Sequence, residues 1–287
     1  MTAHKNIAVL LLTCPDQPGL VSRIADFVFK NGGNILDLDE HADPYEKEFA
    51  LRLAWDYSDF TIEKEDIASE FAKLAQTLKA QWRIQFREPP LRLAVFVSRY
   101  QHCLLELLWR YSLNEFPAEI SVIISNHKDS EKIAEQYQIP FYHYPIDAKI
   151  KDTQEKKELE LLKDHQIDTI VLARYMQILS KRFTEAYPNQ IINIHHSFLP
   201  AFAGADPYRK AHQRGVKIIG ATSHYVTADL DEGPIIEQDI TRISHKDSVE
   251  DLIRKGRDLE RLVFARAIRL HCEHRVLVRG NKTLVFE

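Results

Sequence analysis

The stretch from residue 191 to residue 238 constrains the fold most, because it holds two strand-like segments with polar residues at their ends. The segments are Ile191–His195 and Lys217–Val226, separated by a loop with Pro and Gly and by a short helical segment. Open α/β sheets bind their ligands in the crevice at the carboxyl ends of their strands. The pattern therefore predicts an α/β domain with a functional site where these two segments end.

Three kinds of polar group meet in this stretch. Asn193 and His195 are two residues apart, so in a strand they point to the same face. His224 lies near the end of the second segment, and Asp231 follows seven residues later in the turn LDEGP. An amide can stabilise a developing oxyanion, an imidazole can move a proton, and a carboxylate can orient that imidazole or accept a proton. The set suits addition of water or an amine to a carbonyl; the alternative is a group of structural caps.

A metal site is a second chemical alternative for the same stretch. His195, His196, His224 and Asp231 could supply ligands. Asn193 would be a poor ligand, and no Cys or Glu joins the set. We therefore expect no metal here.

The motifs of this stretch resemble those of a known family. NIHHSFLP, followed by GAT-x-H and then by LDEGPII-x-Q, is similar to the folate-dependent formyl-transfer fold, whose catalytic set is an Asn, a His two residues on and a later Asp. One branch of this family, the formyltetrahydrofolate deformylases, is especially similar in two segments, HHSFLPAF and the tail KGRDLERLVFARAIRLHCEHRVLVRGNKTLVF. The likeness to this branch runs nearly end to end. The resemblance implies that Asn193, His195 and Asp231 are catalytic and that 10-formyltetrahydrofolate is the substrate, with no separate cofactor.

The resemblance also implies a folate pocket. The stretch Leu172–Ser180 is similar to the family's pterin-binding wall, although many relatives carry Arg where Gln177 stands. Ala203 and Asp206, in the loop after Pro200, also depart from the family's usual residues. The alternative is an ordinary buried strand followed by a helix that starts at Ser180. The residues expected to bind substrate are Met176, Gln177, Ile178, Leu179, His196, His224, Val226 and Leu230.

The turn after the first strand of this domain bears on the formyl acceptor. Relatives that formylate a phosphorylated glycinamide have a Gly-rich turn there, which lets backbone amides approach a phosphate. This chain has SRYQHCLLEL, without glycine, so water is the expected acceptor. The resemblance implies that the formate is supplied to one-carbon and purine metabolism. Arg99 or His102 could still meet an anion. A formyltransferase with an amine acceptor and a non-catalytic sensor of folate and amino acids are the alternatives.

Residues 1–87 are expected to form a separate domain. Strand and helix patterns follow in the order β-α-β-β-α-β within about 85 residues, which is typical of a ferredoxin-like sandwich. In the strand Glu48–Tyr57, Phe49, Leu51, Leu53 and Trp55 alternate with smaller or polar residues, so we expect burial on one face only.

The motifs PDQPGL and GGNI resemble those of ACT domains. Such domains pair side by side and bind amino acids, so the resemblance implies a homo-oligomer and an effector such as methionine or glycine. The expected effector contacts are Asp16, Gln17, Gly19 and Asn34. A purely oligomerising module is the alternative.

A linker at residues 88–90, with two adjacent prolines, leads into a second domain at residues 91–287. Its short apolar runs alternate with helical patterns, which indicates a parallel sheet covered on both faces. A long helix is expected over Ser248–His271, with a kink or a break at Gly256, followed by a hairpin around Gly280. The overall expectation is a ferredoxin-like ACT domain followed by a Rossmann-like formyltransferase domain with a mostly parallel sheet.

Composition narrows the partners and the compartment. The formal charge of −4 gives no basic footprint for nucleic acid. The apolar run near the N-terminus is too short for a signal core or a membrane span. Three cysteines, Cys14, Cys103 and Cys272, are far apart and odd in number, which does not describe a disulfide framework. These features predict a cytoplasmic enzyme without nucleic-acid or membrane partners.

Overall fold

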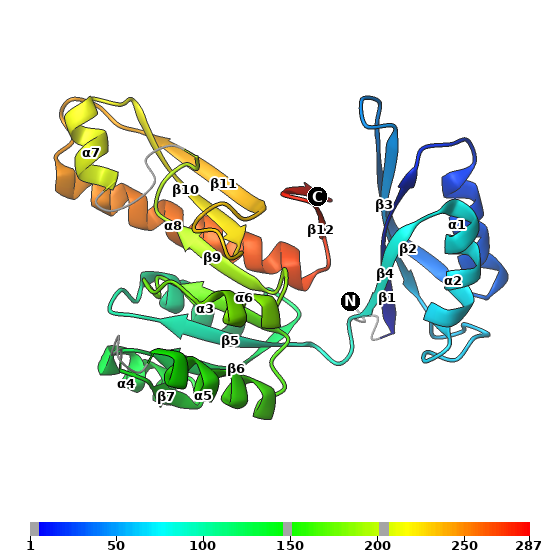
Figure 1. Ribbon diagram of the computed structural model, residues 1–287, viewed down its shortest axis with the longest axis horizontal. Helices are drawn as coiled ribbons and strands as arrows, with labels where there is room; N and C mark the ends of the chain where they lie inside the picture. Colours follow the sequence, from blue (N-terminus) through cyan, green and yellow to red (C-terminus); the bar gives the residue numbers. More distant parts are fainter. Residues whose placement is uncertain (1–5, 146–150, 201–206) are drawn as a thin grey trace. The chain divides into compact units, whose positions relative to one another are not determined.

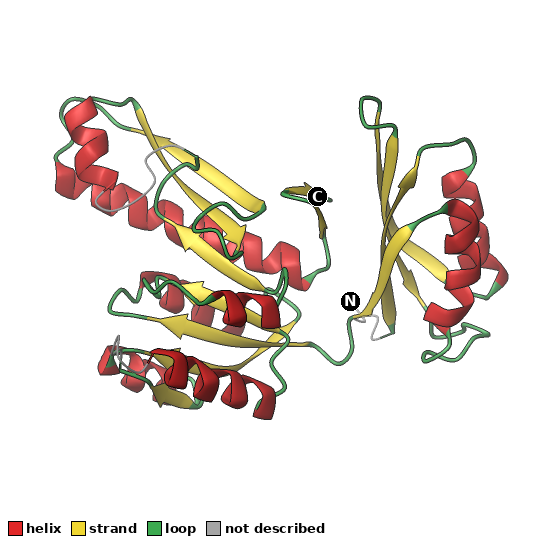
Figure 2. Ribbon diagram, viewed as in Figure 1, coloured by secondary structure: helices red, strands yellow, loops and turns green. Residues whose placement is uncertain are grey.

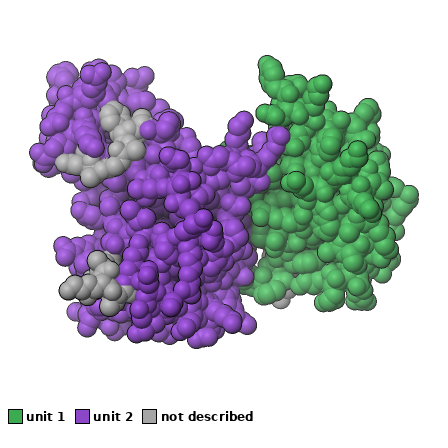
Figure 3. All heavy atoms as spheres, viewed as in Figure 1, with its two compact units in different colours: residues 1–90, 273–277, 285–287 green, residues 91–272, 278–284 purple. Residues whose placement is uncertain are grey.

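A computed structural model describes residues 6–145, 151–200 and 207–287 of the chain. The chain divides into two compact units, which are coloured separately in Figure 3. Unit 1 comprises residues 1–90, 273–277 and 285–287, and unit 2 comprises residues 91–272 and 278–284.

Unit 1 is a four-stranded antiparallel sheet with two helices (Figures 1 and 2). The sheet order is β2-β3-β1-β4, the order of a ferredoxin-like β-α-β-β-α-β unit, as expected. Its core lies between one face of the sheet and the apolar stripes of the helices, which include Ile24 and Phe71. The elements are β1 (Ile7–Pro15), α1 (Leu20–Lys30), β2 (Asn34–Asp43), β3 (Glu48–Asp56), α2 (Ile67–Leu78) and β4 (Gln81–Phe86).

The expectation that β3 is buried on one face only was wrong. Ala50, Arg52 and Ala54, which point away from the helices, are buried as well. Arg52 is fully buried, and its guanidinium donates to the carbonyl oxygens of Glu273 and His274 at 3.1 and 3.0 Å. The segment 273–277 therefore covers the second face of β3, and a segment more than two hundred residues away cannot be inferred from local alternation.

Unit 2 is built on a seven-stranded sheet in the order β11-β10-β9-β8-β5-β6-β7. Five neighbouring strands of this sheet, β9, β8, β5, β6 and β7, run parallel, which confirms the expected mostly parallel sheet. Helices α5 and α6 pack on one face through Leu162 and Phe183, and α8 contacts β9, β10 and β11 and also packs against α3. The elements are β5 (Leu91–Val97), α3 (His102–Ser112), β6 (Ala118–Ser125), α4 (Glu131–Gln136), β7 (Phe141–His143), α5 (Lys151–Asp164), β8 (Thr169–Ala173), α6 (Lys181–Ala186), β9 (Ile191–His195), α7 (Pro207–Arg214), β10 (Ile218–Tyr225), β11 (Ile235–Arg242) and α8 (Val249–Cys272).

The direction of β10 corrects the expected origin of the site. Two parallel strands would end at the same edge of the sheet, but β10 runs antiparallel to β9, and β11 antiparallel to β10. The carboxyl ends of β9 and β10 therefore lie at opposite ends of their ladder. Polar groups from these strands meet because they are cross-strand neighbours.

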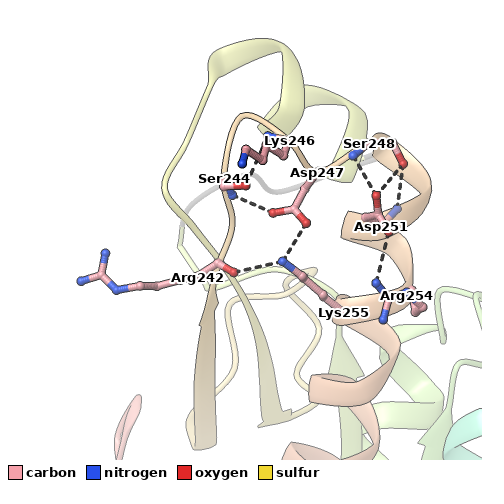
Figure 4. A network of polar contacts seen from close by, with 8 residues as sticks. All are labelled: Arg242, Ser244, Lys246, Asp247, Ser248, Asp251, Arg254 and Lys255. Atoms are coloured by element: carbon pink, nitrogen blue, oxygen red, sulfur yellow. Dashed lines mark hydrogen bonds and ion pairs between the residues drawn. The ribbon is translucent and has the colours of Figure 1, made fainter.

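Helix α8 is one continuous helix of 24 residues, so of the two alternatives at Gly256, a kink or two helices, the second is wrong. Its first turn has a capping box: the Ser248 hydroxyl accepts from the Asp251 amide, and the Asp251 carboxylate accepts from the Ser248 amide, each at 3.1 Å (Figure 4). Gly256 is needed for packing, because a Cβ there would lie 2.0 Å from the Tyr208 hydroxyl of α7. No helix within the described ranges combines the length and the apolar character of a membrane span.

The hairpin expected at the end of the chain is present, as β12 (Val276–Arg279) and β13 (Lys282–Val285). Its turn contains Gly280 at a φ of 56°.

Candidate active site

A cavity of about 370 Å³ lies over the β9–β10 ladder in unit 2. Two loops form its walls: the segment that follows β8 and the segment that connects β10 to β11. The structure brings together in this cavity every catalytic and substrate-binding residue expected from the sequence. The lining includes Asn193, His195, Asp231, Met176, Gln177, Ile178, Leu179, His196, His224, Val226 and Leu230. Ala203 and Asp206 lie outside the described residues.

Asn193 and His224 are directly opposite each other on β9 and β10. The His224 Nδ1 is 2.9 Å from the carbonyl oxygen of Tyr225, which can only accept, so the ring donates there. In the neutral ring the Nε2 is then an acceptor, and it takes a hydrogen bond from the Asn193 Nδ2 at 3.2 Å. This bond fixes the amide orientation of Asn193 and leaves its second N–H available.

The carbonyl of Tyr225 is itself held by close backbone packing. A Cβ at Gly233 would lie 1.8 Å from this oxygen, so only glycine fits there. Gly233 of the motif EGP, which follows Asp231, therefore has a structural reason. A side chain at this position would displace the Tyr225 carbonyl, which sets the His224 tautomer.

His195 and Asp231 form an ion-pair geometry within the cavity. The His195 Nδ1 is 3.3 Å from the Asp231 Oδ2, and the His224 Nε2 is 3.7 Å from the Oδ1. Hydrogen bonding with His195 lowers the pKa of the Asp231 carboxyl well below its usual range, although burial opposes this. Asp231 is therefore ionised at neutral pH and is a weak proton acceptor, which suits it to orient His195.

The other nitrogen of His195 has a different environment. Its Nε2 is buried and has no hydrogen-bond partner among the described residues. With Nδ1–H directed to Asp231, the neutral ring carries its lone pair on Nε2. Asp231 sits at a φ of 57°, a left-handed conformation that is uncommon for a non-glycine residue and that clusters at functional sites.

His196 lies next to the His195 ring, with ring centroids 5.1 Å apart. Burial, followed by the positive charge of Arg174, lowers the pKa of His196 to about 4. The ring is therefore neutral at pH 7 and does not add positive charge to the site.

The wall formed by residues 174–179 exposes large apolar side chains to the cavity. Met176 and Ile178, together with Leu230 on the facing loop, are each more than half exposed. Three large apolar side chains around one cavity are typical of a ligand-binding surface. Arg174 and Met176 both have a φ of 59°, so the loop does not continue the strand geometry of β8.

Two buried carboxyls of α5 hold this wall in place. Glu155 accepts hydrogen bonds from the amide and the hydroxyl of Ser180, the N-cap of α6. Glu158 is hydrogen-bonded to Gln154 and Tyr175. Burial raises the pKa of Glu158 to about 7.

Sequence reasoning missed a charged cluster beside the cavity. Glu260 of α8 is 1 % exposed and accepts from the Tyr208 hydroxyl at 2.8 Å. Its other oxygen is 2.7 Å from the His102 Nε2 and 3.5 Å from the Arg174 Nε. His102 is thus paired with a carboxylate. A signal was present in the sequence, since Glu260 lies on the apolar stripe of α8 between Gly256 and Val263.

Among the described residues, His102, Cys103 and Glu260 have the spacing of a metal site. They do not fit a metal ion. Burial raises the pKa of the Cys103 thiol well above its usual value, so without a metal the thiol is protonated. Both oxygens of Glu260 already take part in hydrogen bonds.

The four expected effector contacts do not come together within one chain. Asp16, Gln17 and Gly19 lie in the β1–α1 connection, beside Glu48 at the start of β3. Asn34 pairs with Asp56 at the other end of β3, about 27 Å away at a typical strand rise.

Comparison with known proteins supports the chemistry suggested by this geometry. Residues 91–268 match the formyl transferase family model. The chain is 55 % identical over 279 residues to formyltetrahydrofolate deformylase of Synechocystis, covering 97 % of this chain and 98 % of that protein. It is 49 % identical to the Bacillus subtilis protein of the same name, covering 96 % and 93 %.

Solved structures agree with the sequence relatives. A formyltetrahydrofolate deformylase from Pseudomonas syringae covers 100 % of this chain, and the chain covers 96 % of it, at a TM-score of 0.95 and 42 % identity. Glycinamide ribonucleotide transformylase 1 from Symbiobacterium toebii is similar over 70 % of this chain and 97 % of its own, with a TM-score of 0.66 and 31 % identity. The similarity to the deformylases spans both units, and the chain belongs to the formyltetrahydrofolate deformylase family.

Proposed function

We propose that this protein is an enzyme that hydrolyses 10-formyltetrahydrofolate to formate and tetrahydrofolate. The observation that carries the proposal is the His195 side chain, whose Nδ1 is oriented by Asp231 while its Nε2 has no partner among the described residues. His195 lines a cavity of about 370 Å³ with an apolar wall. The names of the relatives indicate the substrate.

In the proposed reaction, a water oxygen adds to the formyl carbon while the His195 Nε2 takes the water proton. The free Nδ2–H of Asn193 donates to the formyl oxygen as it becomes negative. The imidazolium of His195 is stabilised by Asp231 and returns the proton to N10 as the carbon–nitrogen bond breaks. The products are formic acid, which ionises to formate, and tetrahydrofolate.

The apolar wall is proposed to hold the flat pterin. Met176, Ile178, Leu179, Val226 and Leu230 supply apolar surface, and the main chain of the 174–179 loop supplies hydrogen-bonding groups at the edge of the ring system. In this proposal Gln177 binds through its backbone, so the absence of a positive charge at that position does not weaken binding. His196 and His224 complete the lining on the side of the reacting carbon.

The decisive experiment incubates the purified full-length chain with 10-formyltetrahydrofolate alone and follows formate by proton NMR. Stoichiometric formate and tetrahydrofolate without any amine support the proposal. Turnover that requires an added amine would identify a formyltransferase instead, and tight folate binding without turnover would identify a sensor. A His195→Gln variant, which preserves a polar side chain, serves as the inactive control.

We further propose that unit 1 is an ACT domain that makes the protein a homo-oligomer regulated by an amino acid such as methionine or glycine. The ferredoxin-like topology supports this assignment. Because Asn34 is remote from Asp16, Gln17 and Gly19 in one chain, these four residues can share a ligand only if two chains pair. Size-exclusion chromatography with light scattering tests the assembly, and a rate unaffected by millimolar amino acids would contradict the regulation.

We also propose a cytoplasmic location. Cys14, Cys103 and Cys272 are all free and buried, which fits a reducing compartment.

A further inference from the structure

A second cavity of about 190 Å³ adjoins the candidate active site within unit 2. Arg174 and His196 line both cavities and therefore separate them. About 10–15 Å³ of such volume is enough for one water, so this cavity can hold a small ion with its hydration. Its remaining walls include Tyr100, His102, Tyr208, Arg257 and Glu260.

Arg174 brings unused hydrogen-bond donors to the wall between the cavities. The side chain is nine-tenths buried, and its Nε and Nη1 make no hydrogen bond to any described residue. The nearest carboxylate, Glu260, approaches the Nε only to 3.5 Å and is already bonded to His102 and Tyr208. A buried guanidinium is costly unless its donors are satisfied, so this geometry favours an anionic ligand.

The charges around the second cavity also favour an anion. Arg174 and Arg257 place their guanidinium carbons 5.4 and 5.8 Å from the centroid of the Tyr100 ring. Glu260 supplies one negative charge against these two positive charges. The neutral His196 ring adds none. The cavity therefore carries a net positive charge and has one buried and one exposed cation.

The position of this cavity suggests which anion it holds. In the proposed reaction tetrahydrofolate fills the first cavity when the carbon–nitrogen bond breaks beside His195. Formate must then leave on the side away from the pterin, and Arg174 and His196 form that boundary. We propose that the second cavity is a product site that binds formate through Arg174 and Arg257 before its release. A guanidinium can hold a planar carboxylate through two parallel hydrogen bonds.

This inference rests on the proposed function for the identity of the anion, and it is tested without turnover. ¹³C-formate is titrated into the purified full-length chain and followed by NMR line broadening. Arg257→Met removes the exposed cation and keeps an unbranched, flexible side chain. Arg254→Met, one turn earlier on α8, is the matched control, because Arg254 pairs with Asp251 and does not line the cavity (Figure 4).

We expect Arg257→Met to weaken formate binding by about tenfold or more, since it removes a charged hydrogen-bond donor. Arg254→Met leaves binding unchanged, and Arg257→Lys restores part of it. Product inhibition by formate in the turnover assay weakens by the same factor. Equal formate affinity in the wild type and in Arg257→Met overturns the inference. The inference is also overturned if the wild type hydrolyses 10-formyltetrahydrofolate but binds no formate. That result leaves the proposed hydrolysis intact. Formate binding without hydrolysis of 10-formyltetrahydrofolate refutes the proposed function instead.

Discussion

Replacing Gly256 by Ala tests whether packing or helix propensity dominates at the centre of α8. In an isolated helix the substitution stabilises by about 0.8–1.0 kcal/mol, because alanine loses less backbone entropy than glycine. In this fold the new Cβ would lie 2.0, 2.3 and 2.6 Å from three atoms of the Tyr208 ring and hydroxyl. Carbon contacts normally begin near about 3.5 Å, so Tyr208 must move by more than about 1 Å.

The displacement has two costs. Overpacking a buried site costs about 1–3 kcal/mol. Losing the 2.8 Å hydrogen bond from Tyr208 to the Glu260 carboxylate costs about 1.5–3 kcal/mol. Together they exceed the gain in helix propensity, so Gly256→Ala lowers the free energy of unfolding by about 1.5–5 kcal/mol.

The assay is urea denaturation followed by circular dichroism, with the slope m compared between variants. The same substitution is made in a Tyr208→Ala background, where the clash is absent and the effect changes sign, to a stabilisation of up to about 1 kcal/mol. If Gly256→Ala stabilises the wild type, or if it destabilises both backgrounds equally, the close approach of Tyr208 to α8 does not control stability and the reasoning is refuted.

Three further results are expected. Asp231→Asn lowers kcat/KM by about a hundredfold or more, because it deprives His195 of the carboxylate that orients it; steady-state rates of formate release within tenfold of wild type contradict this. The pKa of Glu158 is raised from 4.5 to about 7 in the folded protein, so as the pH rises this carboxyl loses its proton in the unfolded chain before it does so in the folded one. The free energy of unfolding of the wild type therefore falls by on the order of 3 kcal/mol as the pH rises from about 4.5 to 7. Urea denaturation of Glu158→Gln across this range shows a smaller fall. Ser248→Ala lowers the free energy of unfolding by about 1 kcal/mol, because it removes the helix cap. Arg254→Met removes only an exposed ion pair with Asp251 and changes this free energy by less than about 0.5 kcal/mol. Equal effects of the two substitutions in urea denaturation count against the cap.

Local periodicity was sufficient to predict which side chains share a face. Asn193 and His195 are two residues apart on β9, and the structure places both in the same cavity. The order of elements in unit 1 was predictable for the same reason, since each strand and helix has its own apolar period. These features depend on neighbouring residues in the chain.

Strand direction and pairing depend on distant parts of the chain, and there the sequence alone was insufficient. The antiparallel direction of β10 was not expected, and β11 was not predicted at all. β11 lies at the sheet edge and is half exposed, so its residues after Ile236 are mostly polar and give little strand signal.

The charged cluster illustrates the same limit at the level of side chains. The Arg174 Nε lies 3.5 Å from a carboxylate oxygen of Glu260. The two residues belong to different elements, since Arg174 is in the loop after β8 and Glu260 is in α8. Neither residue alone indicates a partner, and only the folded chain shows that a second cavity lies between them and the exposed Arg257.

The antiparallel pairing of β9 with β10 has a consequence for how the enzyme can change during evolution. Since Asn193 and His224 face each other across a hydrogen-bonded ladder, their separation is set by the sheet and is insensitive to the length of any loop. Asp231 belongs to the connection between β10 and β11, so it is the member of the set whose position an insertion or deletion can alter. Loop variation can thus shift Asp231 relative to His195 while Asn193 stays in place.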